Sequence, residues 1–478
     1  MTVSADNEVP LFGKALQATT TPIPGMFVFE LPVHGDARGW FKENWQREKM
    51  TALGLPDFGP VQNNISFNDA VGTTRGIHAE PWDKWVSVAT GRIFGAWVDL
   101  REGDSYGNVF TIEIDASRAV FVPRGVGNAY QTLEPDTAYT YLVNDHWSPD
   151  ASYSFLNLAD ETVAIPWPIP LDTAELSEKD RAHPRLADAG AVPRRKTLVL
   201  GANGQVGRAL LSEFSSDASV EFAGRSELSL ESADLATARQ WRDYETIINA
   251  AAYTAVDTAE TADGRWAAWA ANATGVARIA QIATDHGITL VHISSDYVFD
   301  GSLDRPYRED DPVAPLGVYG QSKAAGDVAA GTTPRHYILR TSWVIGDGKN
   351  FVQTMRSLAE RGIAPKVVDD QRGRLTFTED IARAIRHLLE TRPPYGIYNV
   401  SNAGTAMTWA DIAREVFART GHDPESVTGV TTQEYFSTAT TPVSPRPRNS
   451  VLDLAKLTNT GFVAADASER LTALLASD

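Results

Sequence analysis

The arrangement of strands and helices changes abruptly about 190 residues into this 478-residue chain. Up to about residue 170, short runs of β-branched and aromatic residues alternate with Gly, Pro, Asn and Asp, and long helical patterns are scarce. From Lys196 onward, apolar strands alternate with amphipathic helices. The first pattern is typical of an all-β sandwich or barrel, and the second of a parallel sheet with crossover helices. We therefore expect two domains with different architectures.

The boundary between these domains is predicted from composition. Pro184–Lys196 is rich in Pro, Ala and charged residues and poor in large apolar ones, which is typical of a linker. We therefore expect a β domain over residues 1–185, a linker over 186–195 and an α/β domain over 196–478. Examples of the strands predicted in the first domain are Met26–Leu31, Val61–Ser66, Lys84–Ala89, Arg92–Leu100, Val109–Ile114, Ala119–Val122 and Ala138–Val143.

Composition excludes several classes of function. The chain has no cysteine, which rules out disulfides, thiolate metal sites and cysteine catalysis and favours a cytoplasmic protein. We expect no membrane span and no signal peptide, because no apolar run is long enough and the start MTVSADNEVP lacks an apolar core. The net charge of −18, without a basic stripe, disfavours nucleic acid as a partner. An anionic small ligand could still bind a pocket that focuses basic residues.

A glycine turn at the start of the second domain predicts a dinucleotide site. The apolar strand Thr197–Leu200 is followed by glycines at GxxGxxG spacing and then by an amphipathic helix. Such glycines let the backbone approach a pyrophosphate, and the N-terminus of the helix favours the anion. The alternative is a plain strand-to-helix turn. The cofactor-binding candidates in this turn are Gly201, Asn203, Gly204, Gln205, Val206 and Gly207.

The next strands bear on the choice of cofactor. Val220–Ala223 is followed by Gly224-Arg225-Ser226, with no carboxylate. A carboxylate there would bind the ribose 2′-hydroxyl, whereas Arg225 can accept a 2′-phosphate, so NADPH is favoured and NADH stays open. The following strand ends in small residues that would let a cofactor lie against the backbone. The further candidates are Ala250, Ala251, Ala252, Tyr253 and, on the next helix, Asn272.

The segment Val291–Lys323 predicts a catalytic group. Its opening strand ends near Ser295, and Tyr319 and Lys323 follow four residues apart at the start of a predicted helix, on one helical face. We expect the lysine charge to lower the pKa of the Tyr319 phenol, and the Ser295 hydroxyl to complete a Ser–Tyr–Lys group around a carbonyl oxygen. A surface helix with a solvated lysine is the alternative for the Tyr–Lys pair alone.

Basic and imidazole side chains gather on or beside the predicted strands of the first domain. They lie in Asp36–Glu43 and Thr74–His78 and at Lys84. Arginine at a strand end can hold phosphate oxygens, and a histidine with a carboxylate partner can act as a general base, although a lone histidine is more often structural. No His/Glu cluster has the spacing of metal ligands, so we expect no metal in this domain.

The first domain resembles the dTDP-4-dehydrorhamnose 3,5-epimerases, which are metal-free cupin jelly rolls, over about residues 20–185. The matching motifs are Asp36–Phe41, Val61–Asn64, Arg75–His78, Pro123–Gly125, Tyr139–Tyr141, Ser148-Pro149 and Leu176–Asp180. The resemblance implies that His78 removes protons next to the C4 ketone, oriented by Asp180, that Tyr141 reprotonates the opposite face, and that Lys84 stabilises the enolate. The implied substrate contacts are Arg38, Phe41, Glu43, Gln62, Asn64, Arg75 and Asn128.

Two departures from this family pattern keep an alternative open. Asn128 stands where the family usually has a second pocket histidine, and the loop between His78 and Lys84 is shorter than usual. The first domain could therefore epimerise only C3, or serve only for binding or dimerisation.

The second domain resembles the dTDP-4-dehydrorhamnose reductases, extended short-chain dehydrogenases/reductases, almost segment for segment over roughly residues 196–475. Matching segments include HISSDYVFDG, PLGVYGQSK and PRPRNSVLD. The resemblance implies a Rossmann-type doubly wound sheet with a small C-terminal substrate subdomain, and a Tyr319 that protonates the C4 oxygen. Asp296, Tyr297 and Trp343 would line the sugar pocket, although a core aromatic is the alternative for Trp343. Arg446 and Asn449 would meet the nucleotide.

Together the two resemblances predict consecutive reactions on one dTDP-sugar. We expect a fused enzyme that epimerises C3 and C5 and then reduces C4, and a homodimer like the relatives of the first domain. A reductase with an inactive β domain, or a non-catalytic NAD(P)-binding subunit, are the other hypotheses.

Overall fold

The computed structural model describes residues 12–147 and 153–476, so the motif Ser148-Pro149 lies outside the described residues. Contacts divide the chain into two units, residues 1–194 and 195–478. Part of the expected linker packs on the first unit, because Leu186, Ala189 and Val192 join its core and the Val192 N–H donates to the Leu100 carbonyl at 2.7 Å.

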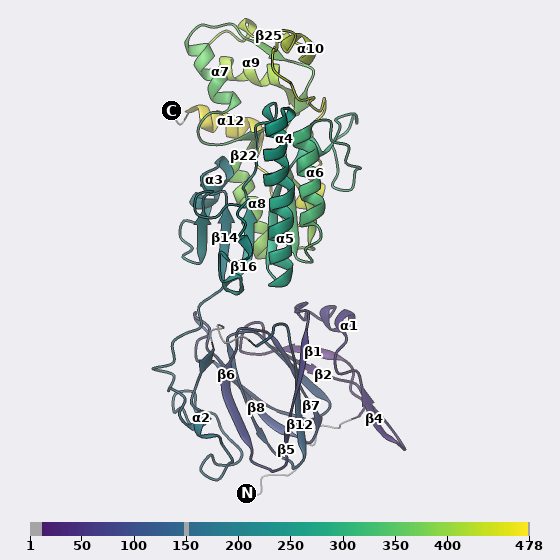
Figure 1. Ribbon diagram of the computed structural model, residues 1–478, viewed down its shortest axis with the longest axis vertical. Helices are drawn as coiled ribbons and strands as arrows, with labels where there is room; N and C mark the ends of the chain where they lie inside the picture. Colours follow the sequence, from purple (N-terminus) through teal and green to yellow (C-terminus); the bar gives the residue numbers. More distant parts are fainter. Residues whose placement is uncertain (1–11, 148–152, 477–478) are drawn as a thin grey trace. The chain divides into compact units, whose positions relative to one another are not determined.

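The first unit consists of two antiparallel sheets, drawn in the lower part of Figure 1. One contains, in spatial order, β1 (Gln17–Thr20), β2 (Phe27–Glu30), β10 (Arg118–Val122), β7 (Lys84–Thr90), β12 (Thr137–Val143) and β5 (Gln62–Asn68). The other contains β13 (Ser154–Phe155), β6 (Thr74–Ala79), β11 (Val126–Thr132), β8 (Ile93–Asp99) and β9 (Val109–Ile114). Residues such as Val86, Trp97 and Tyr139 fill the core between the sheets. The predicted all-β architecture is confirmed.

Three further elements of this unit carry candidate site residues. They are the hairpin of β3 (Val33–Asp36) and β4 (Gly39–Lys42), and the short helices α1 (Arg47–Thr51) and α2 (Glu178–Arg181). In Figure 1 the hairpin projects from the side of the unit that lies away from α2.

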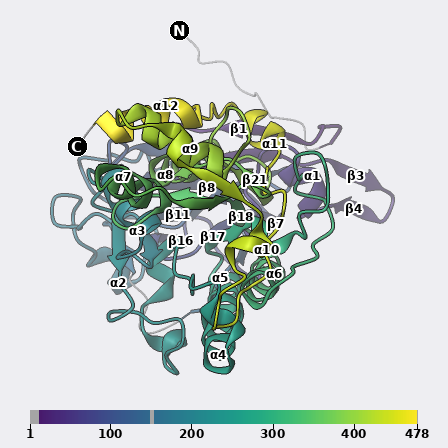
Figure 2. The same ribbon diagram turned by 90° about the horizontal axis from the view of Figure 1, so that it is seen from above.

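The second unit is built on a parallel sheet with the spatial order β15 (Val220–Ala223), β14 (Lys196–Leu200), β16 (Tyr244–Asn249), β17 (Thr289–Ser295), β18 (His336–Thr341) and β23 (Gly396–Val400). Successive residues of β14 face opposite cores. Leu198 packs with residues of α5 (Gly275–Asp285), whereas Val199 packs with residues of α3 (Gln205–Glu213) and α8 (Thr378–Thr391). Helices therefore cover both faces, as Figure 2 shows, and the predicted doubly wound sheet is confirmed.

The remaining elements complete the α5 side of the sheet and form a small C-terminal subdomain with its own core around Val352, Val416 and Leu471. A continuous run of α4 (Ala262–Trp269), a π-helical turn (Ala270–Thr274) and α5 packs beside α6 (Val318–Ala330). The other elements are β19 (Val344–Ile345), α7 (Phe351–Glu360), β20 (Lys366–Val368), β21 (Arg372–Gly373), β22 (Thr376–Phe377), β24 (Met407–Thr408), α9 (Trp409–Arg419), β25 (Thr428–Val430), α10 (Thr432–Tyr435), α11 (Ala455–Thr458) and α12 (Ala467–Ala476). Among the described residues, no helix is long and apolar enough to cross a membrane.

Candidate active sites

A histidine–aspartate pair joins β6 to α2 in the first unit. His78 Nε2 lies 2.9 Å from Asp180 Oδ1, and the Asp180 backbone N–H donates to the Ser177 hydroxyl at the start of α2. Burial by itself would raise the pKa of the Asp180 carboxyl, but the hydrogen bonds and charge of His78 and the bond from Ser177 hold it below its ordinary value. The carboxylate therefore stays ionised, so it can orient His78 and stabilise the imidazolium that forms when His78 takes a proton.

A second polar group occupies the start of β7. The buried Lys84 forms an ion pair with Glu80, and its ammonium lies 5.4 Å from the centre of the Tyr141 ring. Burial, and then the charge of Glu80, raises the pKa of Tyr141, while the nearby Arg75 acts in the opposite direction. Tyr141 thus keeps its proton at neutral pH, which is the form a proton donor needs. Sequence reasoning missed Glu80, although its position two residues after His78 places both side chains on the same face of an extended strand.

Three of the predicted substrate residues lie on or beside the β3–β4 hairpin, and the structure does not show them in contact with His78 or Lys84. Arg38 pairs with Asp36 and has an 89% exposed side chain, and Phe41 is 65% exposed. Glu43 pairs with Lys49. The hairpin projects from the side of the unit that lies away from α2 (Figure 1).

The other predicted substrate residues of the first unit lie on the sheets. Gln62 and Asn64 share the edge strand β5, where Gln62 Nε2 donates to Asn64 Oδ1 at 2.8 Å. Arg75 Nε donates to Asn68 Oδ1 at 3.1 Å. Both residues of the Gln62–Asn64 pair are half-buried on the face of β5 opposite to the exposed Ile65.

The predicted substrate contact Asn128 has partners inside the barrel. Its Oδ1 accepts a hydrogen bond from Trp97 Nε1 at 2.9 Å, and its Nδ2 donates to the Tyr139 hydroxyl at 3.0 Å. The side chain is buried and both of its polar ends have partners inside the barrel. Asn128 therefore has the contacts of a core residue and stabilises the sheet that carries His78 opposite it, and its contact with substrate stays a prediction.

Two glycines in the turn of the second unit have no room for a side chain. A Cβ on Gly201, whose φ is +79°, would lie 2.6 Å from the Ala251 nitrogen, and one on Gly207 would lie 2.3 Å from the Gly201 carbonyl oxygen. Gly204 is the N-cap of α3, and no side chain caps this end. The free N–H groups of a first helical turn, held close to a strand end, fit the pyrophosphate of a dinucleotide. Asn203, Gln205 and Val206 lie within this turn and helix start.

This turn lies at the point where the strand order reverses. The chain passes from β14 to β15 on one side and then returns to β16 on the other, and ligands of such sheets bind at the carboxyl ends of the two strands flanking that point. Ala250–Tyr253 follow β16 at this edge. Asn272, from the π-helical turn, bonds to both the N–H and the carbonyl of Tyr253 and to the Ser322 hydroxyl, so it holds the cofactor-binding loop in place.

Two carboxylates that the sequence Gly224-Arg225-Ser226 did not reveal lie near Arg225. Arg225 Nη2 donates to Glu231 Oε1 at 2.9 Å, and Glu227 Oε2 accepts the Gly224 N–H at 2.7 Å. Glu227 comes three residues after the turn, and this spacing is the signal that could have identified it. An incoming 2′-phosphate would have to compete with Glu231 for Arg225.

The predicted Ser–Tyr–Lys group lies where β17 ends and α6 begins. Ser295 is the last residue of β17, and its hydroxyl is hydrogen-bonded to Tyr319. Lys323 is buried, and its ammonium donates to the Ile293 carbonyl at 2.5 Å. The expected lowering of the Tyr319 pKa is wrong for this structure. Burial, and then the charge of Asp296, raises the pKa of Tyr319 to about 12, and burial lowers the pKa of Lys323 to about 8.

Three predicted sugar or nucleotide contacts surround Tyr319. The Tyr297 ring lies edge-on to the Tyr319 ring, with centres 5.6 Å apart. Burial raises the pKa of the adjacent Asp296 to about 7. Arg446 is hydrogen-bonded to Tyr297 and pairs with Asp257 at 2.8 Å. Sequence reasoning missed Asp257, which fixes the Arg446 guanidinium.

Trp343 and Asn449 have structural partners. The Trp343 ring stacks on Trp409 with centres 3.7 Å apart, and its backbone φ is +45°, which is rare for a bulky residue. Asn449 Nδ2 donates to the carbonyls of Leu303 and Arg305, at 2.7 and 2.9 Å, and its Oδ1 accepts the Val451 N–H. The amide of Asn449 therefore ties down a loop, which differs from the expected nucleotide contact.

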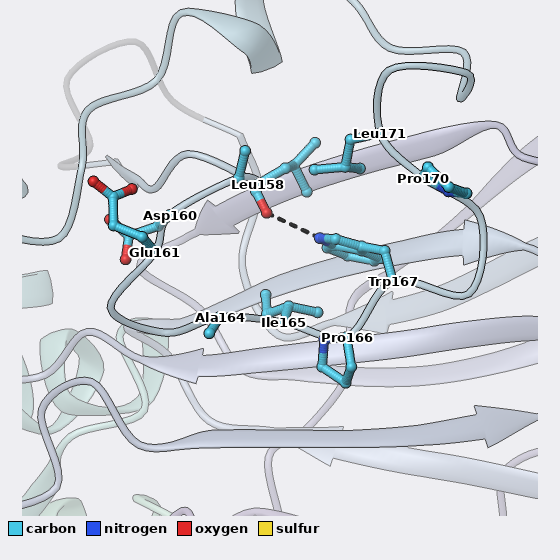
Figure 3. A pocket seen from close by; sticks show the side chains of 10 residues that line it. Leu158, Asp160, Glu161, Ala164, Ile165, Pro166, Trp167, Pro170 and Leu171 are labelled. Carbon is cyan, nitrogen blue, oxygen red and sulfur yellow. Dashed lines mark hydrogen bonds between the residues drawn. The ribbon is translucent and has the colours of Figure 1, made fainter.

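A hollow of about 540 Å³ lies elsewhere on the first unit. Figure 3 shows it lined mainly by apolar side chains, including Ile165, Pro166 and Trp167. The Trp167 indole N–H is already bonded to the Leu158 carbonyl. Asp160 accepts three backbone N–H groups, including that of Leu186. The indole of Trp167 and the carboxylate of Asp160 are thus engaged within the protein, and Glu161 is largely exposed beside Arg185, so we assign no site to this hollow.

The folds and the two sites define a β-sandwich enzyme domain fused to a nucleotide-dependent reductase domain. A family model described as dTDP-4-dehydrorhamnose 3,5-epimerase matches residues 20–188, and one described as RmlD substrate binding domain matches residues 195–478. The chain therefore belongs to the dTDP-4-dehydrorhamnose 3,5-epimerase family in its first unit and to the RmlD substrate binding domain family in its second.

Individual relatives show the same division. The "Protein RmlC homolog" of Streptococcus pyogenes is 52% identical over 35% of this chain and 87% of its own length. The dTDP-4-dehydrorhamnose reductase of Mycolicibacterium smegmatis is 36% identical over 57% of this chain and 82% of its own. A solved dTDP-4-dehydrorhamnose reductase of Bacillus anthracis in complex with NADP is 31% identical, with a TM-score of 0.55, over 59% of this chain and 99% of that one.

Proposed function

We propose that this chain converts dTDP-4-dehydro-6-deoxyglucose into dTDP-L-rhamnose, by epimerisation at C3 and C5 in the first unit and reduction of C4 in the second. One observation carries the proposal: a single chain holds both the His78–Asp180 pair and the Ser295–Tyr319–Lys323 group, each in a unit of the matching family. The product of the first reaction is the substrate of the second.

The first unit would perform proton chemistry next to the C4 ketone. His78, held by Asp180, takes the proton from the carbon beside the ketone, and the enolate oxygen that results is stabilised by the Lys84 ammonium. Tyr141 then delivers a proton to the opposite face of the same carbon. A base, a cation for the developing oxyanion and a protonated acid are the groups that such an inversion needs.

The second unit would complete the sugar. Tyr319 donates its proton to the C4 oxygen, Ser295 holds that oxygen by hydrogen bonding, and Lys323 keeps positive charge beside the phenol. The hydride that C4 receives comes from NADPH when that cofactor is bound. The turn Gly201–Gly207 and the backbone of Ala250–Ala252 would hold the cofactor, because Gly201 packs directly against the backbone of Ala250 and Ala251 and the turn opens the N-terminus of α3.

NADPH is favoured over NADH by two observations. Arg225 follows β15 and is 81% exposed at its side chain, so it is free to turn toward a 2′-phosphate after leaving Glu231. The relative from Bacillus anthracis was solved with NADP. The lack of cysteine fits a cytoplasmic enzyme.

We also propose a homodimer formed through the first unit. The edge strand β5 exposes Ile65 and Phe67, and the projecting hairpin exposes Trp40 and Phe41. Exposed apolar side chains on an unpaired edge strand form a surface that another copy could cover. Such a copy could bring the Arg38 and Phe41 hairpin to the neighbouring His78 site. Ile65→Asp should convert a dimer, measured by light scattering on the purified chain, into a monomer, and an unchanged mass would contradict this face.

The experiment is an incubation in heavy water with dTDP-4-dehydro-6-deoxyglucose and NADPH, with His78→Ala alongside. Deuterium at C3 and C5 of a dTDP-rhamnose product, absent with His78→Ala, is the expected result. If NADPH is consumed only after a separate epimerase is added, the first unit is not catalytic and the function reduces to that of a reductase with an attached module.

A further inference from the structure

His78 and Asp180 have a third neighbour that the epimerisation does not use. His183 follows α2, and its Nε2 lies 3.8 Å from Asp180 Oδ1, the same oxygen that lies 2.9 Å from His78 Nε2. One ligand atom from each of these three side chains lies within 4.8 Å of the other two. His183 comes three residues after Asp180 in the sequence, whereas His78 lies 102 residues before Asp180, so the fold brings the three side chains together.

The His183 side chain is buried beside Asp180. It is 6% exposed, and within the described residues its polar neighbours are the Asp180 carboxylate and the backbone of Leu156, so at least one of its two ring nitrogens has no hydrogen-bond partner. Its ring stacks on Phe155, with centres 4.8 Å apart, and lies edge-on to His78 at 5.4 Å. Leaving a buried polar group without a partner is costly, so an imidazole in this position indicates a ligand that it could bind.

The three donors fit a zinc ion. Two imidazole nitrogens and one carboxylate oxygen form a frequent Zn²⁺ ligand set, and bond lengths of about 2.0–2.2 Å in a tetrahedron place ligand atoms roughly 3.3 Å apart. Asp180 Oδ1 lies 2.9 Å from His78 Nε2 and 3.8 Å from His183 Nε2, so these two separations are close to that value, one below and one above it. His78 is 35% exposed, so the fourth position would open toward solvent or substrate.

We propose that His78, Asp180 and His183 form a Zn²⁺ site whose occupation switches the epimerase off. A metal ion between His78 and Asp180 would replace the hydrogen bond that orients the base, and would occupy the nitrogen lone pair of His78. The inhibition rests on the proposed epimerase function, whereas the metal binding does not.

Metal binding is tested on the full-length chain after treatment with a chelator. Titration with Co²⁺ should give the visible absorption of a tetrahedral ion, and Zn²⁺ should displace it. His183→Gln should weaken Zn²⁺ binding at this site at least tenfold, while the matched variant His422→Gln, on the second unit, should bind as the parent chain does. Equal affinity in His183→Gln and the parent would overturn the site.

Two further measurements separate the parts of the proposal. X-ray absorption of the Zn²⁺-loaded parent needs no variant and should show two imidazole ligands, so a shell of oxygen ligands alone would overturn the site even if His183→Gln failed to fold.

Deuterium exchange into the 4-dehydro sugar should fall with added Zn²⁺ in the parent and recover with chelator. The same loss in His183→Gln would overturn the switch. Absence of exchange in metal-free parent, together with the Co²⁺ spectrum, would instead contradict the epimerase function alone.

Discussion

Replacing Lys323 by Met should stabilise the second unit at neutral pH while it abolishes reduction. Lys323 is 2% exposed, and burial lowers its pKa from 10.5 to about 8. At 1.36 kcal/mol per pKa unit, keeping this ammonium charged in the folded state costs roughly 3 kcal/mol. The substitution also removes the hydrogen bond to the Ile293 carbonyl, worth about 1 kcal/mol. The net gain in unfolding free energy should therefore be roughly 2 kcal/mol at pH 7.

The sign of the pH dependence gives a second check. Because the folded pKa lies below the unfolded one, the unfolded chain binds more protons between pH 8 and about 10.5, and the unfolding free energy of the parent rises over that window. Lys323→Met lacks this contribution. The advantage of the variant should therefore shrink above pH 8 and disappear by about pH 10.

The assay is urea unfolding without cofactor, with pulsed hydrogen exchange on peptides of β17 and α6 so that the second unit is followed separately. Lys366→Met is the matched control, because the side chain of Lys366 is 68% exposed and its removal should change stability by less than about 0.5 kcal/mol. A Lys323→Met variant that is less stable than the parent at pH 7, or an advantage independent of pH, would refute the reasoning.

Three further substitutions test the two sites. Asp180→Asn should lower deuterium exchange at C3 and C5 by about 10²–10³-fold, because His78 loses its charged partner, while reduction of an already epimerised substrate continues unchanged. Tyr319→Phe should affect the other reaction: NADPH oxidation should fall at least about 10²-fold, while deuterium exchange at C3 and C5 stays unchanged. Unchanged NADPH oxidation in this variant would support a non-catalytic second unit. Gly207→Ala should weaken NADPH binding about tenfold or more, because its Cβ would lie 2.3 Å from the Gly201 carbonyl oxygen. Fluorescence titration with NADPH measures this change. The control Gly190→Ala, where a Cβ meets nothing within 4 Å, should bind NADPH as the parent does.

The strands that carry the epimerase site were harder to predict than those that form the surrounding sheets. The apolar segment Val109–Ile114 coincides with β9, whereas β6 and β11 were not among the strands named from the sequence pattern. Both contain a glycine and several polar residues, and both are largely buried, so they show neither alternation nor an apolar run. Their polar residues find partners across the barrel, as Asn128 does with Trp97, and a single sequence does not contain this information.

Distance along the chain explains the other omissions. The role of His78 depends on Asp180, and only the resemblance to a family joined them before the fold was known. His183 and Glu80 each lie close in sequence to a predicted site residue, so inspection of neighbours at the spacing of a helix turn or a strand face would have found them. Whether such a neighbour pairs with Lys84, as Glu80 does, or lies buried beside Asp180, as His183 does, depends on tertiary packing.

The Tyr319–Lys323 pair shows where spacing alone misleads. A separation of four residues correctly predicts that the side chains share a helix face, but the pKa of each depends on burial, which the spacing does not reveal. Here the effect of burial is larger than the effect expected from the Lys323 charge, and it raises the pKa of Tyr319 to about 12. For reduction this direction is the useful one, because the phenol must hold its proton until the C4 oxygen gains negative charge. Lys323, with a pKa of about 8, remains charged at neutral pH and can then stabilise the phenolate that the proton leaves behind.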